Sequence, residues 1–308
     1  MGRLTILIAM DYELYHDESK EEGYWHGILL VPVSKKQTLV SNLGAVRENV
    51  QYTYPIGIKK VKRPGRIYTL AECWVQIGVL ALMSVHKGPP PGVFLGNCVK
   101  GKKQYSQFTE TIACKFIVFR EIDDHAKMSD RLDYAGKVET TFRIGLKGGL
   151  HFLGSAKEPI RVEKIHFDGH KHYRRHVDRD RIVGRLTGLR QYCSVADFPD
   201  LIDDRSSDHR RVDCQKYADC QLLQLTDLLV GCFRTALMGP TRAIHAELAR
   251  PVKAIVERYG KGYARMRYSR WLDSFCMSQS YLESGQWHFE TIKCQPDLRG
   301  LQMELPLE

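Results

Sequence analysis

The chain has 308 residues, 43% of them hydrophobic and 27% charged, with a formal net charge of +10. This length and apolar content are sufficient for one large domain or two smaller ones with a real core. No run of eighteen apolar residues is present, so we expect no transmembrane helix and no membrane partner.

The positive charge favours a polyanionic partner such as a nucleic acid. The amino terminus has only a short apolar run before Asp11 and Glu13, which is too short for a secretion signal. Ile6 stands where N-myristoylation requires Ser or Thr. The nine cysteines are an odd number without any Cys-x-x-Cys, which favours a reducing compartment, and we expect a cytoplasmic protein.

The first half of the chain alternates strand and helix patterns. One strand is expected to end at Asp17, and a strongly apolar strand follows over residues 23–31. Residues 34–50 predict a helix with Ser34 as its cap. Residues 70–85 predict a buried helix, preceded by Thr69 and Glu72 at capping spacing.

The second half continues the alternation. Strands are predicted at 115–122 and 162–168, and an irregular loop is predicted at 197–211. Helices are predicted over residues 130–153, loosened near Gly145 and Gly148-Gly149, and over 180–194, 220–233 and 242–259. The pattern favours one α/β domain, residues 1–238, followed by a helical and basic C-terminal extension, residues 239–308.

Three carboxylates occupy positions where charge is unfavourable. Asp17 and Asp168 each end a predicted strand, and Asp227 interrupts an otherwise apolar helix. Convergence on a divalent metal would compensate all three. Each also has a local explanation: a turn at Asp17, a tight turn at Asp168-Gly169, or a salt bridge at Asp227.

Two motifs carry a resemblance to a known family. The segments Asp17-Glu18-Ser19-Lys20 and Leu223-Gln224-Leu225-Thr226-Asp227-Leu228 are similar to the hallmarks of the domain of unknown function 3800 family. Those hallmarks are Asp-Glu-Ser-Gly after the first strand and a Leu-Gln-Leu-Ala-Asp-Leu helix. The resemblance covers residues 10 to 235 and includes the strand that ends at Asp168. Lys20 departs from the family glycine, and Asp219-Cys220 matches a family Asp-Ser only loosely.

The resemblance implies a ribonuclease H-like fold, a mixed sheet flanked by helices. In that fold, acidic residues on the first strand, a later strand and a following helix gather around metal. Asp17, Asp168 and Asp227 match these positions, with Glu18 as a further candidate. The implied activity is a metal-dependent nuclease that uses Mg²⁺ or Mn²⁺ to hydrolyse phosphodiester bonds.

Basic segments supply candidate contacts to a nucleic-acid backbone. Beside Asp168, the loop of residues 166–176 carries several basic residues and histidines, none of them at zinc spacing. His170 or His172 could move a proton there. Segments 59–66, 100–103 and 258–267 are also basic, and the last includes tyrosines suited to stacking. The candidate nucleic-acid contacts are Lys171, Arg174, Arg175, Lys102, Arg265 and Arg267. The alternative for each segment is a solvated surface.

The sequence therefore leaves several functions open. The first is the nuclease. The second is a non-catalytic subunit of an antiviral-defence or mobile-element system that binds nucleic acid or protein, and the third is a phosphatase or nucleotide hydrolase. No phosphate-binding P-loop motif and no Gly-x-Ser-x-Gly motif occurs. The C-terminal extension could equally form a homodimer or bind a partner protein.

Overall fold

The computed structural model describes residues 10–21, 23–82, 112–122, 134–154, 158–168, 178–196, 201–202, 215–260, 274–284 and 286–292. Within these residues, eight strands form one mixed sheet with the order β5-β4-β1-β2-β3-β7-β8, and β6 pairs with β4. The strands are β1 Met10–Ser19, β2 Tyr24–Pro32, β3 Lys115–Glu121, β4 Ile160–Asp168, β5 Cys193–Val195, β6 Leu201–Ile202, β7 Phe275–Glu283 and β8 Gln286–Thr291. The α/β prediction is confirmed at this level.

The central strand β1 has one antiparallel and one parallel neighbour. It pairs with β2 in the antiparallel sense and with β4 in the parallel sense. Strand β3 is antiparallel to β2 and parallel to β7, which forms a hairpin with β8. Because β1 lies inside the sheet, both of its edges are paired and both of its faces meet helices.

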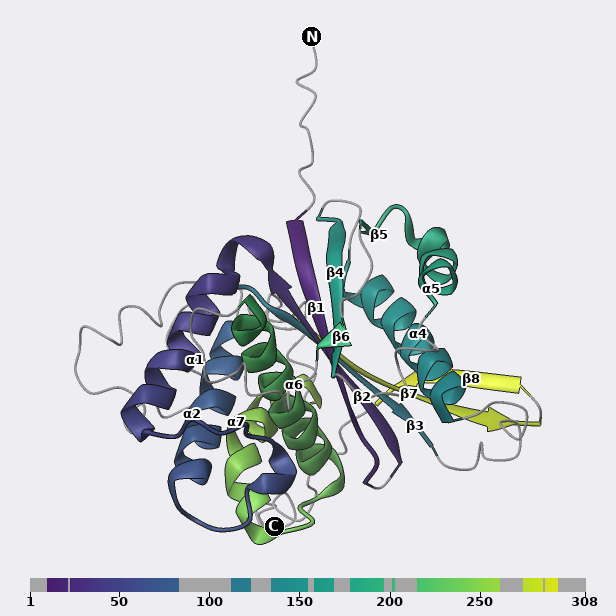
Figure 1. Cartoon of the computed structure of the whole chain (residues 1–308). Helices are drawn as coiled ribbons and strands as arrows, with labels where there is room; N and C mark the ends of the chain where they lie inside the picture. The colour runs from purple at the N-terminus through teal and green to yellow at the C-terminus, as the bar shows by residue number, and fades with distance from the viewer. Residues whose placement is uncertain are drawn as a thin grey trace, which may run out of the picture.

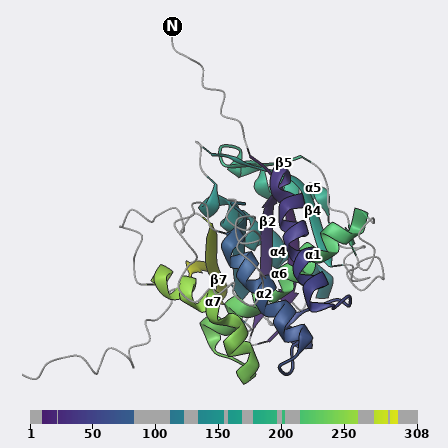
Figure 2. The same ribbon diagram turned by 90° about the vertical axis from the view of Figure 1, so that its left-hand side faces the viewer.

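Helices cover the sheet on both sides (Figures 1 and 2). One side carries α1 Lys36–Val50, α2 Arg66–Ala81, α6 Gln215–Met238 and α7 Ala243–Gly260; the other carries α4 Tyr134–Leu153 and α5 Arg179–Leu186. Successive strand residues alternate between two core clusters, as the pleat requires. Tyr15 and Leu29 belong to the cluster on the α6 side, whereas Leu14 and Ile28 belong to the cluster on the α4 side.

Several predicted elements differ in their bounds. Helix α1 starts at Lys36, after a short 3₁₀ turn at Val33–Lys35, and Ser34 does not cap it. Helix α2 starts at Arg66, one turn before the predicted start, with Gly65 at its N-cap. The loosening predicted in the helix over residues 130–153 is wrong, because α4 continues unbroken from Tyr134 to Leu153.

The helix predicted over 180–194 is wrong in its second half. Helix α5 ends at Leu186, a 3₁₀ turn follows at Thr187–Leu189, and β5 begins at Cys193. Ile182, Leu186, Leu189 and Cys193 have helical spacing and all face the same core, although they belong to a helix, a 3₁₀ turn and a strand. The spacing therefore identifies the buried residues correctly, but it predicts the wrong secondary structure for the second half of the segment.

The C-terminal extension is not purely helical. After α7, strands β7 and β8 extend the same sheet beyond β3 (Figure 1). Phe275 and Met277 face the α6 side and Cys276 faces the α4 side, so both faces of β7 contribute to the core.

Among the described residues, no single helix has the length and apolar character to cross a membrane. Lys216–Met238 and Ala243–Glu257 pass that test only as a pair, with a 94° bend between them.

Candidate functional site

The parallel pairing of β1 and β4 brings two predicted carboxylate positions together. Tyr15 is the register partner of His166, and their rings stack with centroids 4.6 Å apart. His16 then pairs with Phe167. The next step along both strands reaches Asp17 and the backbone of Asp168, which also pairs with Ile202 of β6. The two aspartates therefore hold neighbouring positions at the carboxyl ends of parallel strands.

Asp17 faces the α6 side of the sheet. The hydroxyl of Tyr15 lies 2.8 Å from Oδ1 of Asp219 on α6, and strand alternation sends Asp17 to the same side. Asp17 is half-buried, and its Oδ1 accepts a hydrogen bond of 2.8 Å from the backbone N–H of Glu18. A metal site shared with Asp227 on α6 would require Asp17 to point to this side of the sheet.

Glu18 faces the opposite side. Strand β1 continues to Ser19, so the chain does not turn at Glu18. The Glu18 carboxylate accepts a 2.6 Å hydrogen bond from the hydroxyl of Tyr24 and lies 3.6 Å from Nζ of Lys20. The preceding even-numbered residue, His16, packs against Phe142 of α4. The structure does not bring Glu18 to the face that Asp17 occupies.

Asp227 lies on α6, where the helix meets the α1–α2 connection. Its Oδ2 accepts a 3.1 Å hydrogen bond from the backbone N–H of Ile58, the first residue of the 3₁₀ turn η2, Ile58–Lys60. The approach is close enough that a Cβ on Gly57 would overlap the Asp227 carboxylate.

The path of α6 along β1 shows where Asp227 lies relative to Asp17. Asp219 contacts Tyr15 at one level of β1. Further along the helix, Val230 packs on Gly27, the β2 partner of Asp17; a Cβ on Gly27 would lie only 2.6 Å from that of Val230. Asp227 occupies the helix between these two levels. The element that carries it therefore passes Asp17 on the face where Asp17 points.

A second group of ionisable side chains lies earlier along the same elements. We call it the acid–lysine cluster; it consists of Glu13, Tyr15, Lys36, His166 and Asp219. The Nζ of Lys36 lies 2.6 Å from Glu13 Oε2 and 2.8 Å from Asp219 Oδ1. The Tyr15 hydroxyl lies 2.6 Å from the same Glu13 oxygen, and His166 Nε2 lies 3.2 Å from it. All five side chains are buried or nearly so.

Contacts among the groups of this cluster shift their pKa values. Burial alone would raise the pKa of Glu13, but hydrogen bonds from His166, Lys36 and Tyr15 outweigh it and hold that pKa well below its ordinary value. Burial opposes the charge of Lys36, but Asp219 and Glu13 raise its pKa. Burial and the two carboxylates raise the pKa of Tyr15 well above its ordinary value. The Glu13 carboxylate is thus held ionised beside the Lys36 ammonium group.

The acid–lysine cluster also offers metal ligands. One ligand atom each from Glu13, His166 and Asp219 lies within 4.8 Å of the other two. The same oxygens of both carboxylates, however, already contact the ammonium of Lys36. A lysine in that place supplies the positive charge that a cation would otherwise supply, so the cluster suits a structural ion pair better than a divalent metal.

The sequence alone does not predict Glu13 and Lys36 as partners in a site. The available signal was a charged residue in an inward-facing position of a buried strand, since Glu13 shares the face of Tyr15 and Asp17. Of the predicted nucleic-acid contacts, Lys102, Lys171, Arg174, Arg175, Arg265 and Arg267 all lie outside the described residues. His170 and His172 lie outside them as well.

Comparison with known proteins identifies no family. No protein-family model matches the chain, and neither a curated protein nor a solved structure is significantly similar to it.

Proposed function

We propose that this protein is a metal-dependent nuclease of ribonuclease H-like fold, with Asp17, Asp168 and Asp227 as ligands of Mg²⁺ or Mn²⁺. The observation that supports the proposal most directly is the neighbouring position of Asp17 and Asp168 on parallel β1 and β4. The mixed sheet with helices on both sides agrees with the fold that the family resemblance implies.

The donor set suits a hard divalent cation. Carboxylate oxygens are the ligands that Mg²⁺ takes in proteins, usually together with water and substrate phosphate. Such ions activate a water molecule and stabilise the leaving oxygen in phosphodiester hydrolysis. Asp17 offers a half-buried carboxylate on a central strand, and its Oδ1 accepts the backbone N–H of Glu18. Helix α6, on the face of the sheet to which Asp17 points, carries Asp227.

The first prediction tests the carboxylates one at a time. Asp17→Asn and Asp227→Asn should each reduce Mg²⁺-dependent cleavage of a labelled oligonucleotide by at least about 100-fold, because the amide removes a ligand charge while keeping the side-chain shape. In Asp227→Asn the new amide oxygen can still accept the N–H of Ile58, so the fold is expected to persist. Circular dichroism and gel-resolved cleavage assays measure the two properties.

A matched control is available on the same strand. Asp11 is half-exposed and lies 3.7 Å from Arg161 in a surface ion pair, so Asp11→Asn should leave cleavage within about two-fold of wild type. Cleavage by the wild-type protein that persists in excess EDTA, or full activity in Asp17→Asn, would contradict the proposed metal mechanism.

One observation favours a non-catalytic binding subunit as the second candidate. Asp227 accepts the backbone N–H of Ile58, so its carboxylate has a structural role without any metal. Titration calorimetry with Mn²⁺ separates the candidates. The nuclease requires Mn²⁺ binding that Asp17→Asn weakens, whereas a binding subunit would retain oligonucleotide binding with no heat of Mn²⁺ binding at these aspartates.

A further inference from the structure

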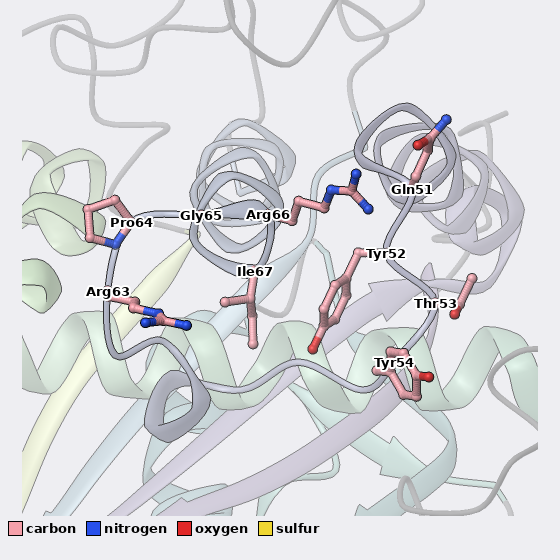
Figure 3. Close-up of a pocket in the computed structure, with 9 residues that line it drawn as sticks. All are labelled: Gln51, Tyr52, Thr53, Tyr54, Arg63, Pro64, Gly65, Arg66 and Ile67. Atoms are coloured by element: carbon pink, nitrogen blue, oxygen red, sulfur yellow. The ribbon is translucent and has the colours of Figure 1, made fainter.

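The connection between α1 and α2 surrounds a hollow on the surface of the molecule. The chain runs from Gln51 through Tyr54 along one side and returns through Arg63 to Ile67 on the other (Figure 3). The hollow has a volume of about 700 Å³, which lies in the range of sites that hold a small ligand. We call it the α1–α2 hollow.

The side chains of the α1–α2 hollow combine cations with aromatic rings. Arg63 and Tyr52 point into it from opposite sides, with Arg66 above and Tyr54 at the rim (Figure 3). None of its 9 lining residues is acidic. Arg63 and Arg66 are exposed, and neither makes an ion pair within the part of the chain that the structure describes. Two guanidinium groups are therefore available to a ligand from solution.

The start of α2 adds to the positive character. The helix begins at Arg66, after Gly65 at φ 149°, and both residues line the hollow. No side chain caps this end and no acidic residue lies in its first turn. The first N–H groups of a helix lack partners within the helix and carry its positive dipole end. Backbone and side chains thus favour an anion in the same place.

The tyrosine side of the hollow is fixed in advance by a buried arginine. The guanidinium of Arg47 donates to the backbone oxygens of Tyr52 and Tyr54 at 3.0 and 2.7 Å. It also donates to the side-chain oxygens of Gln221 and Gln224 on α6, at 2.9 and 3.0 Å. This side is therefore tied to the core helix before any ligand binds, which reduces the entropy lost on binding.

The tyrosine rings have the exposure that base stacking needs. Tyr54 is 54% exposed, and its ring stands at 63° to that of Tyr52 with centroids 5.8 Å apart. Tyrosine faces bind unstacked bases without strict sequence preference. Bases in a duplex are covered by their neighbours, so an exposed stacking face beside paired arginines suits a single strand.

We infer that the α1–α2 hollow binds a nucleotide unit of single-stranded nucleic acid, with Arg63 and Arg66 on the phosphodiester and Tyr54, backed by Tyr52, against the base. The choice of nucleic acid as the ligand rests on the proposed function. The same connection also carries Gly57 and Ile58, which contact Asp227. A strand held in the hollow would therefore lie beside the helix that carries the proposed catalytic carboxylate.

The test measures binding of a fluorescein-labelled twelve-nucleotide single strand by anisotropy, in EDTA and at fixed salt. Arg63→Ala/Arg66→Ala should raise the dissociation constant by about 10- to 100-fold, since charge-assisted contacts to phosphate are lost. The slope of log affinity against log salt should fall by about 1.4, because each phosphate contact on a single strand contributes about 0.7.

The matched control removes the same charge elsewhere. Arg185 and Arg190 are exposed and lie at and after the end of α5, on the other side of the sheet. Arg185→Ala/Arg190→Ala should change the dissociation constant by less than about three-fold. Equal weakening by both double variants would show that only net charge matters, and it would overturn the inference.

Stacking is tested separately. Tyr54→Ala should weaken binding by at least about five-fold and Tyr54→Phe by less than about two-fold, because the ring face is the contact. Binding of the wild-type protein to duplex in preference to single strand, or no binding to either, would also overturn the inference.

These measurements contain no divalent metal, so they do not depend on cleavage. If the single strand binds at the hollow but no metal-dependent cleavage occurs, the nuclease proposal fails and the inference stands. If Arg63→Ala/Arg66→Ala changes neither the affinity for the single strand nor the metal-dependent cleavage, the inference about the hollow fails and the nuclease proposal stands.

Discussion

At the scale of single residues, Lys36 holds together two carboxylates that would otherwise repel each other. Its ammonium lies within 2.8 Å of both Glu13 and Asp219, and all three side chains are mostly buried. Removing one partner of such a group leaves uncompensated charge, which costs more than the intact pairing contributes. The cluster is therefore expected to be sensitive to loss of the lysine in particular.

Lys36→Met keeps the length of the side chain and removes its charge. We expect the free energy of unfolding at pH 7 to fall by about 2–3 kcal/mol, below the range for fully buried pairs because the lysine is partly exposed. Urea denaturation followed by circular dichroism measures this change.

A double variant controls for lost packing. Adding Glu13→Gln to Lys36→Met should restore about 1 kcal/mol or more, because the remaining carboxylate repulsion is relieved. A purely additive result would show that electrostatic pairing is not the source of the loss.

The candidate site shows which residue positions the sequence could predict. Strand alternation alone is enough to place Asp17 and Glu18 on opposite faces, because it needs only local backbone geometry. The pairing of Glu13 with Lys36 and Asp219 could not be predicted in this way. It depends on how α1 and α6 dock on β1, across 183 residues between Lys36 and Asp219.

At the scale of elements, the contact of α4 with β3 depends on glycine. A Cβ on Gly145 would lie 2.8 Å from Cβ of Phe119, and one on Gly149 would overlap Ile117. Because glycine lowers helix propensity, the sequence alone predicts that these glycines loosen the helix. Their actual effect comes from the neighbouring strand, which a single-helix pattern does not contain.

Gly149→Ala and Gly148→Ala form a matched pair on the same helix. Gly149→Ala should reduce the free energy of unfolding by about 1–3 kcal/mol through overpacking against Ile117. Gly148 has nothing within 4 Å of its added Cβ, so Gly148→Ala should stabilise the protein by up to about 1 kcal/mol. Thermal and urea denaturation measure both, and the same sign for both variants would contradict the packing argument.

At the scale of the whole molecule, the sheet joins distant parts of the chain. Strand β7 pairs with β3, which lies more than 150 residues earlier, and the β7–β8 hairpin lies at one edge of the sheet (Figure 1). The alternation of strands and helices predicted the α/β class because that pattern is local. The added edge strands were missed because their short apolar pattern becomes informative only once β3 offers an unpaired edge.

The whole fold is also expected to depend on pH through two buried histidines. His16 Nε2 lies 2.8 Å from His26 Nδ1, and both side chains are buried on the α4 side. Burial lowers the pKa of His26 to about 4, against a smaller opposing effect of Glu18, and burial and His26 lower the pKa of His16. Both groups stay neutral in the folded state and bind protons more readily once unfolded.

The sign of the effect follows from this difference. Below about pH 6.5 the unfolded chain takes up protons that the folded protein does not, so stability is complete above that pH and falls as the pH decreases towards 4. The slope is at most about 1.4 kcal/mol per pH unit for each histidine. Glu13, whose pKa is lowered, loses its contribution only below its ordinary value of 4.5, so measurements at pH 4.5 and above separate the two effects.

His16→Leu/His26→Leu tests the assignment. Replacing both partners removes the titration together with the need for a hydrogen bond, so the dependence of unfolding free energy on pH between 7.5 and 4.5 should flatten. The exposed His151 provides the control, and His151→Gln should retain the wild-type slope. Urea denaturation at four pH values measures the slopes. If the double variant keeps the wild-type slope, the acid sensitivity comes from other groups and not from this buried pair.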